Sequence, residues 1–159
     1  MSQFLPACGP PPAEGPGAED CAIDVVLSGQ IEDHVSGPRY CRASGIYDSP
    51  ASRAKSWMDG PHGEFGVELF DVSEGQLGAV KAALSINKHT KPSSGWATPY
   101  AACDITIDEW RLQYESTDGA SYLYVGTGTC TSPAQAYGTE TGEVTFGDFS
   151  LRSWIVWSR

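Results

Sequence analysis

Apolar and polar residues alternate along most of the chain between residues 21 and 157. The clearest alternation begins at Cys103, passes through Ile105 and Ile107, and continues to Tyr114. An Asp-Gly turn signal follows, and a return run rich in Tyr and Val ends at Cys130. A period of two on both sides of a tight turn predicts a β-hairpin, here with a cysteine at each open end.

The same alternation predicts five further strands, at residues 21–28, 40–47, 65–70, 79–87 and 144–157. The run at 79–87 also fits a helix, because Ser73-Glu74-Gly75-Gln76 matches a capping box. Gly75 and Gly78 would each cost such a helix about 1 kcal/mol, so we expect a strand. In the last run the apolar phase changes at Gly147, which indicates a β-bulge.

Segments rich in Gly, Pro, Ser and Asp separate these runs. We expect turns or loops at Asp33–Gly37, 48–64, 87–99 and 131–142, with one helical turn as an option for Arg53–Met58. About seven strands at short spacing, with no sustained helical period, predict an all-β fold, an antiparallel β-sandwich. The cysteines fall in local pairs and not in the Cys…Trp…Cys order of immunoglobulin domains, so we expect a non-immunoglobulin sandwich formed by residues 21–159.

Four of the five cysteines lie within this predicted domain. Cys21 and Cys41 lie on consecutive predicted strands, as Cys103 and Cys130 do, so these two pairings are favoured among the three that four cysteines allow. Two hairpins stapled in this way indicate an oxidising, extracytoplasmic compartment.

The fifth cysteine, Cys8, ends the segment Leu5-Pro6-Ala7-Cys8, which resembles the lipobox of bacterial lipoproteins. The resemblance implies a small, β-rich lipoprotein that is secreted or tethered to the bacterial envelope through a lipid on Cys8. Pro6 departs from the pattern, and the seven residues before Cys8 are too few for an export signal. Either translation starts upstream or the resemblance is accidental. We favour the first, because residues 9–20 form a Pro-rich acidic segment typical of a spacer.

The formal net charge is −10, from 20 acidic and 10 basic residues, and the basic residues are scattered. This argues against a nucleic-acid partner, which requires a concentrated cationic surface, and against attraction to anionic lipid. A lipid anchor on Cys8 is therefore the only membrane association that we expect.

Motifs for hydrolytic, nucleotide-dependent or zinc chemistry are absent from the sequence. Asp104 and Asp108 share a strand face but lie about 13 Å apart by the rise per residue, too far for a glycosidase pair. Asp71, Glu74 and Asp118 are candidate calcium ligands in loops, although no calcium-loop motif contains them. We expect no catalytic residue, metal or cofactor.

Aromatic residues are the remaining candidates for a binding site, since the chain contains five tryptophans and seven tyrosines. Trp96, Tyr100 and Trp57 lie in predicted polar loops, where they are candidates for stacking on sugars or anchoring a protein. We therefore expect a non-enzymatic domain that binds an unknown protein or glycan at the cell surface. The alternatives are a carbohydrate-binding module that uses Trp96 and Tyr100, and a hydrolase with an unrecognised site.

Overall fold

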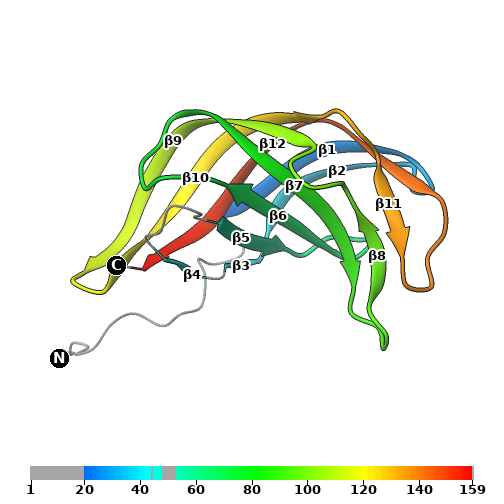
Figure 1. The fold of residues 1–159 in the computed structure, drawn as a ribbon, viewed down its shortest axis with the longest axis horizontal. Coiled ribbons are helices and arrows are strands. Elements are labelled where there is room, and N and C mark those ends of the chain that lie inside the picture. The colour runs from blue at the N-terminus through cyan, green and yellow to red at the C-terminus, as the bar shows by residue number, and fades with distance from the viewer. Residues whose placement is uncertain (1–19, 44, 48–52, 159) are drawn as a thin grey trace.

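The computed structural model describes residues 20–43, 45–47 and 53–158. These residues form an all-β fold (Figure 1), which confirms the predicted class. The strands are β1 (Cys21–Gly29), β2 (Asp33–Arg39), β3 (Cys41–Ala43), β4 (Gly45–Tyr47), β5 (Arg53–Met58), β6 (Glu64–Phe70), β7 (Gly78–Lys88), β8 (Ser94–Ala97), β9 (Cys103–Ser116), β10 (Gly119–Cys130), β11 (Ala134–Tyr137) and β12 (Glu143–Ser158). The predicted spacer, Cys8 and the Asp48–Pro50 turn lie outside the described residues.

All twelve strands belong to one sheet, whose main path runs β2-β1-β12-β10-β9-β7-β6-β5-β3. Only Tyr40 separates β2 from β3, so the chain itself joins the two ends of this path. The sheet therefore closes around one core, with antiparallel pairing except where β4 runs parallel to the end of β12. A sandwich is not confirmed by these pairings, and the expected number of about seven strands is wrong.

The additional strands lie in segments that we expected to be loops, because these segments are rich in turn-forming residues. Arg53–Met58 is strand β5 and not a loop or helical turn, because it pairs along its whole length with β6. Asp33–Gly37 belongs to β2, and the turn lies just before it. The predicted strand at 40–47 is divided into β3 and β4, and the loops at 87–99 and 131–142 contain β8 and β11. Pairing with longer neighbours overrides the local turn signals in these short strands.

Two further predictions from the sequence are confirmed. The ambiguous segment forms β7 (Gly78–Lys88), a strand with its even-numbered residues from Val80 to Ile86 buried. The phase change at Gly147 is a β-bulge, because Val25 pairs with Phe149 whereas Leu27 pairs with Phe146. On both sides of this bulge β12 keeps its large apolar side chains in the core.

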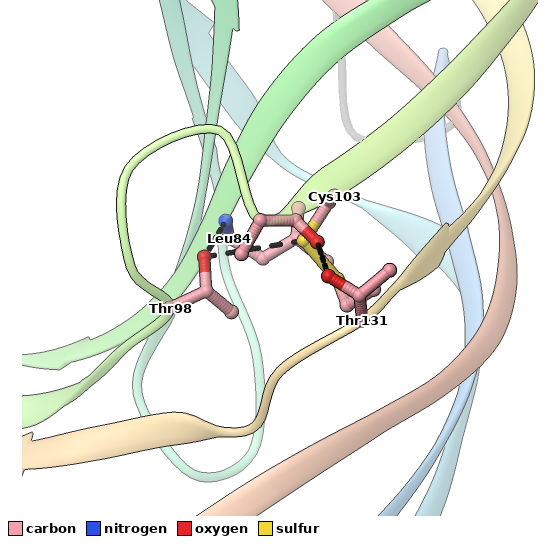
Figure 2. Close-up of a disulfide and its surroundings, with 6 residues drawn as sticks. Leu84, Thr98, Cys103 and Thr131 are labelled. Carbon is pink, nitrogen blue, oxygen red and sulfur yellow. Dashed lines mark hydrogen bonds between the residues drawn. A yellow bond between two sulfur atoms is a disulfide. The ribbon is translucent and has the colours of Figure 1, made fainter.

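Both predicted disulfides are present, Cys21–Cys41 and Cys103–Cys130. The second closes the open end of the β9–β10 hairpin, and Figure 2 shows it with Thr98 on one side and Thr131 on the other. The Thr98 hydroxyl accepts a hydrogen bond from the Leu84 backbone N–H at 3.0 Å. The Thr131 hydroxyl donates to the Ala102 carbonyl at 3.0 Å. The bridge is thus held within a local hydrogen-bond network that also reaches β7.

One edge of β7 is shared between two partners. Its first half, Gly78–Ala82, pairs with β9, and its second half, Ser85–Lys88, pairs with β8. β8 in turn pairs with β11, and β11 pairs with the beginning of β12. The wall between β7 and β12 is therefore formed by β8 and β11 at one end of the molecule and by the β9–β10 hairpin at the other (Figure 1).

Candidate functional site

A pocket of about 590 Å³ opens at the end of the closed sheet where β8 and β11 form the wall. We call it the mouth pocket. Its lining comes from the β1–β2 turn, the β5–β6 turn, the end of β7, β8 and the β11–β12 connection: Gln30, Ile31, Pro61, His62, Gly63, Lys88, Trp96 and Glu140. Pockets of this size at the open end of a closed sheet are common positions for small ligands.

Trp96 forms the aromatic wall of the mouth pocket. It pairs with Ile86 on one side and Ala136 on the other, in the register that turns its side chain inward, and only 2% of its surface is exposed. The indole N–H donates to the Thr141 carbonyl at 3.2 Å, and the Lys88 ammonium lies 5.3 Å from the ring centroid. These contacts fix the ring, so that Trp96 is a rigid wall and not a projecting platform.

One ion pair and one hydrogen bond between a histidine and a carboxylate supply the polar groups in and beside the pocket. Lys88 Nζ lies 3.0 Å from Glu140 Oε2, and His62 Nε2 lies 2.7 Å from Asp33 Oδ2. The hydrogen bond from His62 lowers the pKa of Asp33, with a smaller contribution from His34, so the Asp33 carboxylate is ionised near neutral pH. The pocket therefore combines an aromatic side chain with hydrogen-bond donors and acceptors, and the charges of Lys88 and Glu140 cancel.

The three aromatic residues predicted to bind a ligand are not brought together. Trp96 lines the mouth pocket, although it lies in a strand and is buried. Tyr100 is 71% exposed, but its ring packs 4.4 Å from that of Phe70, at the end of β6 away from the mouth. Trp57 lies on β5, where the Arg42 guanidinium covers its ring at 4.6 Å from the centroid. Only Trp96 is therefore placed to contribute to this site.

Several pocket residues were not singled out from the sequence. Gln30, His62, Lys88 and Glu140 come from four separate turns or strand ends, and Lys88 and Glu140 are 52 residues apart. No spacing in the sequence connects them, because the closure of the sheet brings their turns together. The only sequence signal was the presence of charged residues beside Gly-rich and Pro-rich turns.

A second hollow of about 620 Å³ lies on the outer face of β1, β12, β10 and β9. It contains Asp24, Asp104 and Asp148 among threonine and serine residues. Asp24 is hydrogen-bonded to His34 and Asp104 forms an ion pair with Lys81, each at 2.8 Å, so two of its carboxylates already have side-chain partners. Phe149 supplies an apolar ring to this hollow but, unlike the Trp96 indole, has no polar atom, and we regard the mouth pocket as the better candidate.

Among the described residues, no group of three or more His, Cys, Asp or Glu side chains is arranged to hold a metal ion. Of the loop carboxylates considered for calcium, Glu74 accepts a hydrogen bond from the Tyr122 hydroxyl and Asp118 lies in the β9–β10 turn. Nor does the described part of the chain contain a helix long and apolar enough to span a membrane.

Comparison with protein-family models, with curated proteins and with solved structures finds no match to this chain.

Proposed function

We propose that this protein is a non-enzymatic, extracytoplasmic binding domain whose mouth pocket takes a small hydroxylated ligand of the sugar type. The observation that carries the proposal is the position of the rigid Trp96 wall beside the Lys88–Glu140 pair and His62. The proposal joins the surface-interaction role expected from the sequence to its carbohydrate-binding alternative, and it relies on Trp96 without Tyr100.

The chemistry of a sugar suits this lining. A pyranose presents C–H groups that can contact the small part of the Trp96 indole that the pocket exposes, and hydroxyl groups that both donate and accept hydrogen bonds. Glu140 offers an acceptor, Lys88 offers donors, and His62 offers a ring nitrogen. Because ion pairing holds these side chains in place before a ligand arrives, little conformational entropy is lost on binding.

The pairing of the charged groups also favours binding over catalysis. Lys88 and Glu140 neutralise each other at 3.0 Å, and the residues that line the pocket include no serine, threonine or cysteine that His62 could activate as a nucleophile. A general acid or base needs a group that is available for proton transfer to the substrate. We therefore propose no reaction for this pocket.

The two disulfides are consistent with an extracytoplasmic location. Attachment to a bacterial envelope through Cys8 is the finer proposal. If the protein is expressed from a start upstream of Met1, the intact mass should show a diacylglyceryl group on Cys8. A soluble product with unmodified Cys8 would remove the tether from the proposal and leave the binding domain.

Affinity electrophoresis on a polysaccharide panel, followed by calorimetry with fragments of any retarding glycan, tests the binding function. We expect Glu140→Gln to weaken binding about tenfold, because a charged acceptor is replaced by a neutral amide. Glu143→Gln is the matched control, since Glu143 lies outside the pocket and pairs with Gln135 at 2.8 Å. Absence of retardation on every glycan, or equal affinities of the two variants, would overturn the proposal.

A further inference from the structure

We infer that the mouth pocket takes the end of a glycan chain, its terminal sugar residues, and not a stretch from the middle of a chain. This rests on the proposed function, because it specifies which part of a sugar polymer enters the same site. The observation that carries it is a rim that surrounds the pocket on all sides.

Connections between strands form this rim and go around the whole sheet. In the order of the sheet they are the β1–β2 turn, the β11–β12 connection, the β7–β8 hairpin and the β5–β6 turn. Each of them contributes at least one lining residue. The pocket is therefore surrounded by the chain and is not a groove between two separate walls.

Main-chain pairing makes most of the rim continuous. The β1–β2 turn is joined to β12 by the Gln30 N–H, which donates to the Glu143 carbonyl at 2.8 Å. From β12 the wall continues through β11 and β8 to β7, because each of these strands pairs with the next. β7 in turn pairs with β6 as far as Asn87 opposite Glu64, beside the β5–β6 turn.

Side chains complete the rim where strand pairing ends. In the described part of the chain, no strand pairing joins the β5–β6 turn to β2. His62 and Asp33 bridge this junction, with 2.7 Å between Nε2 and Oδ2. On another side of the pocket, Lys88 Nζ lies 3.0 Å from Glu140 Oε2 and links the β7–β8 hairpin to the β11–β12 connection. The rim is thus closed by backbone and side-chain contacts together.

Buried apolar side chains close the pocket from below. Leu27, Ile86 and Val144 lie on strands that lead away from the rim, and all three are buried in one continuous core cluster. Trp96, which lines the pocket, belongs to the same cluster. The interior of a small closed sheet is commonly filled by its own side chains in this way. A ligand therefore enters from outside and stops at the core.

A closed rim above a filled core selects a ligand by its shape. A sugar in the middle of a linear chain has a glycosidic neighbour on each side, and the two neighbours would have to leave in opposite directions through the rim. A terminal sugar has one neighbour, which leaves through the entrance. The volume of about 590 Å³ lies within the usual range of about 300 to 1,000 Å³ for small-ligand pockets.

Calorimetry with the linear trisaccharides and hexasaccharides of the cello, xylo, manno, malto and chito series tests this inference. In every series that binds, we expect the two affinities to agree within about twofold, because sugars beyond the pocket add no contact. Borohydride reduction, which opens the sugar ring at the reducing end, then distinguishes the two ends of the chain. Unchanged affinity assigns the non-reducing end to the pocket, and a loss of about tenfold or more assigns the reducing end.

A variant of the pocket shows whether both lengths use the same contacts. Glu140→Gln should weaken the trisaccharide and the hexasaccharide by the same factor, because both place the same terminal sugars beside this side chain. Glu143→Gln is the matched control and should leave both affinities unchanged. It alters a side chain outside the pocket and keeps the backbone carbonyl that accepts from Gln30.

An affinity that rises more than about twofold from the trisaccharide to the hexasaccharide would show that the chain contacts the protein beyond the pocket. The same conclusion would follow if Glu140→Gln weakened only the trisaccharide. In either case the chain-end inference fails and the binding function stands. If no saccharide of any series and no member of the polysaccharide panel binds, the proposed function fails, and the chain-end inference fails with it.

Discussion

The hydroxyl of Ser153 donates a hydrogen bond to the hydroxyl of Ser56 at 2.9 Å, although their strands β12 and β5 do not pair. Both side chains are buried, and 97 residues separate them in the sequence. The bond therefore crosses the interior and ties the long final strand to the wall opposite it. The buried Tyr124 of β10 lies beside this pair, which makes a small polar cluster in an otherwise apolar core.

We expect Ser153→Ala to lower the free energy of unfolding by about 1 to 3 kcal/mol, because it leaves the Ser56 hydroxyl without this partner in a dry environment. The double variant Ser56→Ala/Ser153→Ala should lose less than the sum of the two single changes. Urea unfolding of the four proteins measures the coupling. Ser150→Ala, at an exposed position of the same strand, should change stability by less than about 0.5 kcal/mol. Strict additivity would contradict a direct interaction.

Tyr124 should make the protein sensitive to strong alkali. Burial raises the pKa of Tyr124 to about 12, against a smaller opposing effect of the Ser56 and Ser153 hydroxyls. In the unfolded chain the tyrosine hydroxyl ionises near pH 10. Below about pH 10, therefore, the full stabilising contribution of the neutral Tyr124 side chain is present. This contribution, on the order of 2 to 3 kcal/mol, is lost as the pH rises from about 10 through about 12.

Unfolding by urea at a series of pH values checks the expectation for Tyr124. Tyr124→Phe should flatten the alkaline part of the stability profile. Tyr100→Phe should leave it unchanged, because Tyr100 is largely exposed. A profile that is equally steep in Tyr124→Phe would show that another group causes the alkaline loss.

Reduction of the two disulfides should lower the melting temperature. They close loops with sequence separations of 20 and 27 residues, for which the chain-entropy estimate is about 3 to 4 kcal/mol each. Calorimetry of Cys21→Ala/Cys41→Ala and Cys103→Ala/Cys130→Ala separates the two contributions. If reductant leaves the melting temperature unchanged, the bridges do not stabilise the fold, and the argument for an oxidising compartment loses its basis.

Local sequence signals were sufficient where an element is stabilised by its own neighbours in the chain. The β9–β10 hairpin and both disulfides are of this kind. The bulge at Gly147 lies opposite the distant strand β1, but it was visible as a phase change within one run of the sequence. β5 was missed because its inward residues include Ala54 and Ser56, which give a weak apolar alternation. β8 and β11 were missed because each has only four residues between turn-forming segments. Their pairing partners lie far away in the sequence.

The candidate site shows even more clearly the difference between features visible in the local sequence and features that depend on distant strands. Trp96 was identified from the sequence as an aromatic residue in a polar segment, but its inward orientation follows from pairing with both β7 and β11. His62, Lys88 and Glu140 meet only after the sheet has closed. A site assembled from separate turns leaves no regular spacing, so the sequence alone could not reveal it.

The division of the β7 edge between β8 and β9 gives the two ends of the molecule separate structural support. The long β9–β10 hairpin can change in length or in the residues at its tip while β8 and β11 continue to hold the pocket wall. Conversely, the turns around the pocket can vary without disturbing the register of the hairpin. One closed sheet therefore provides two surfaces that natural selection can alter independently.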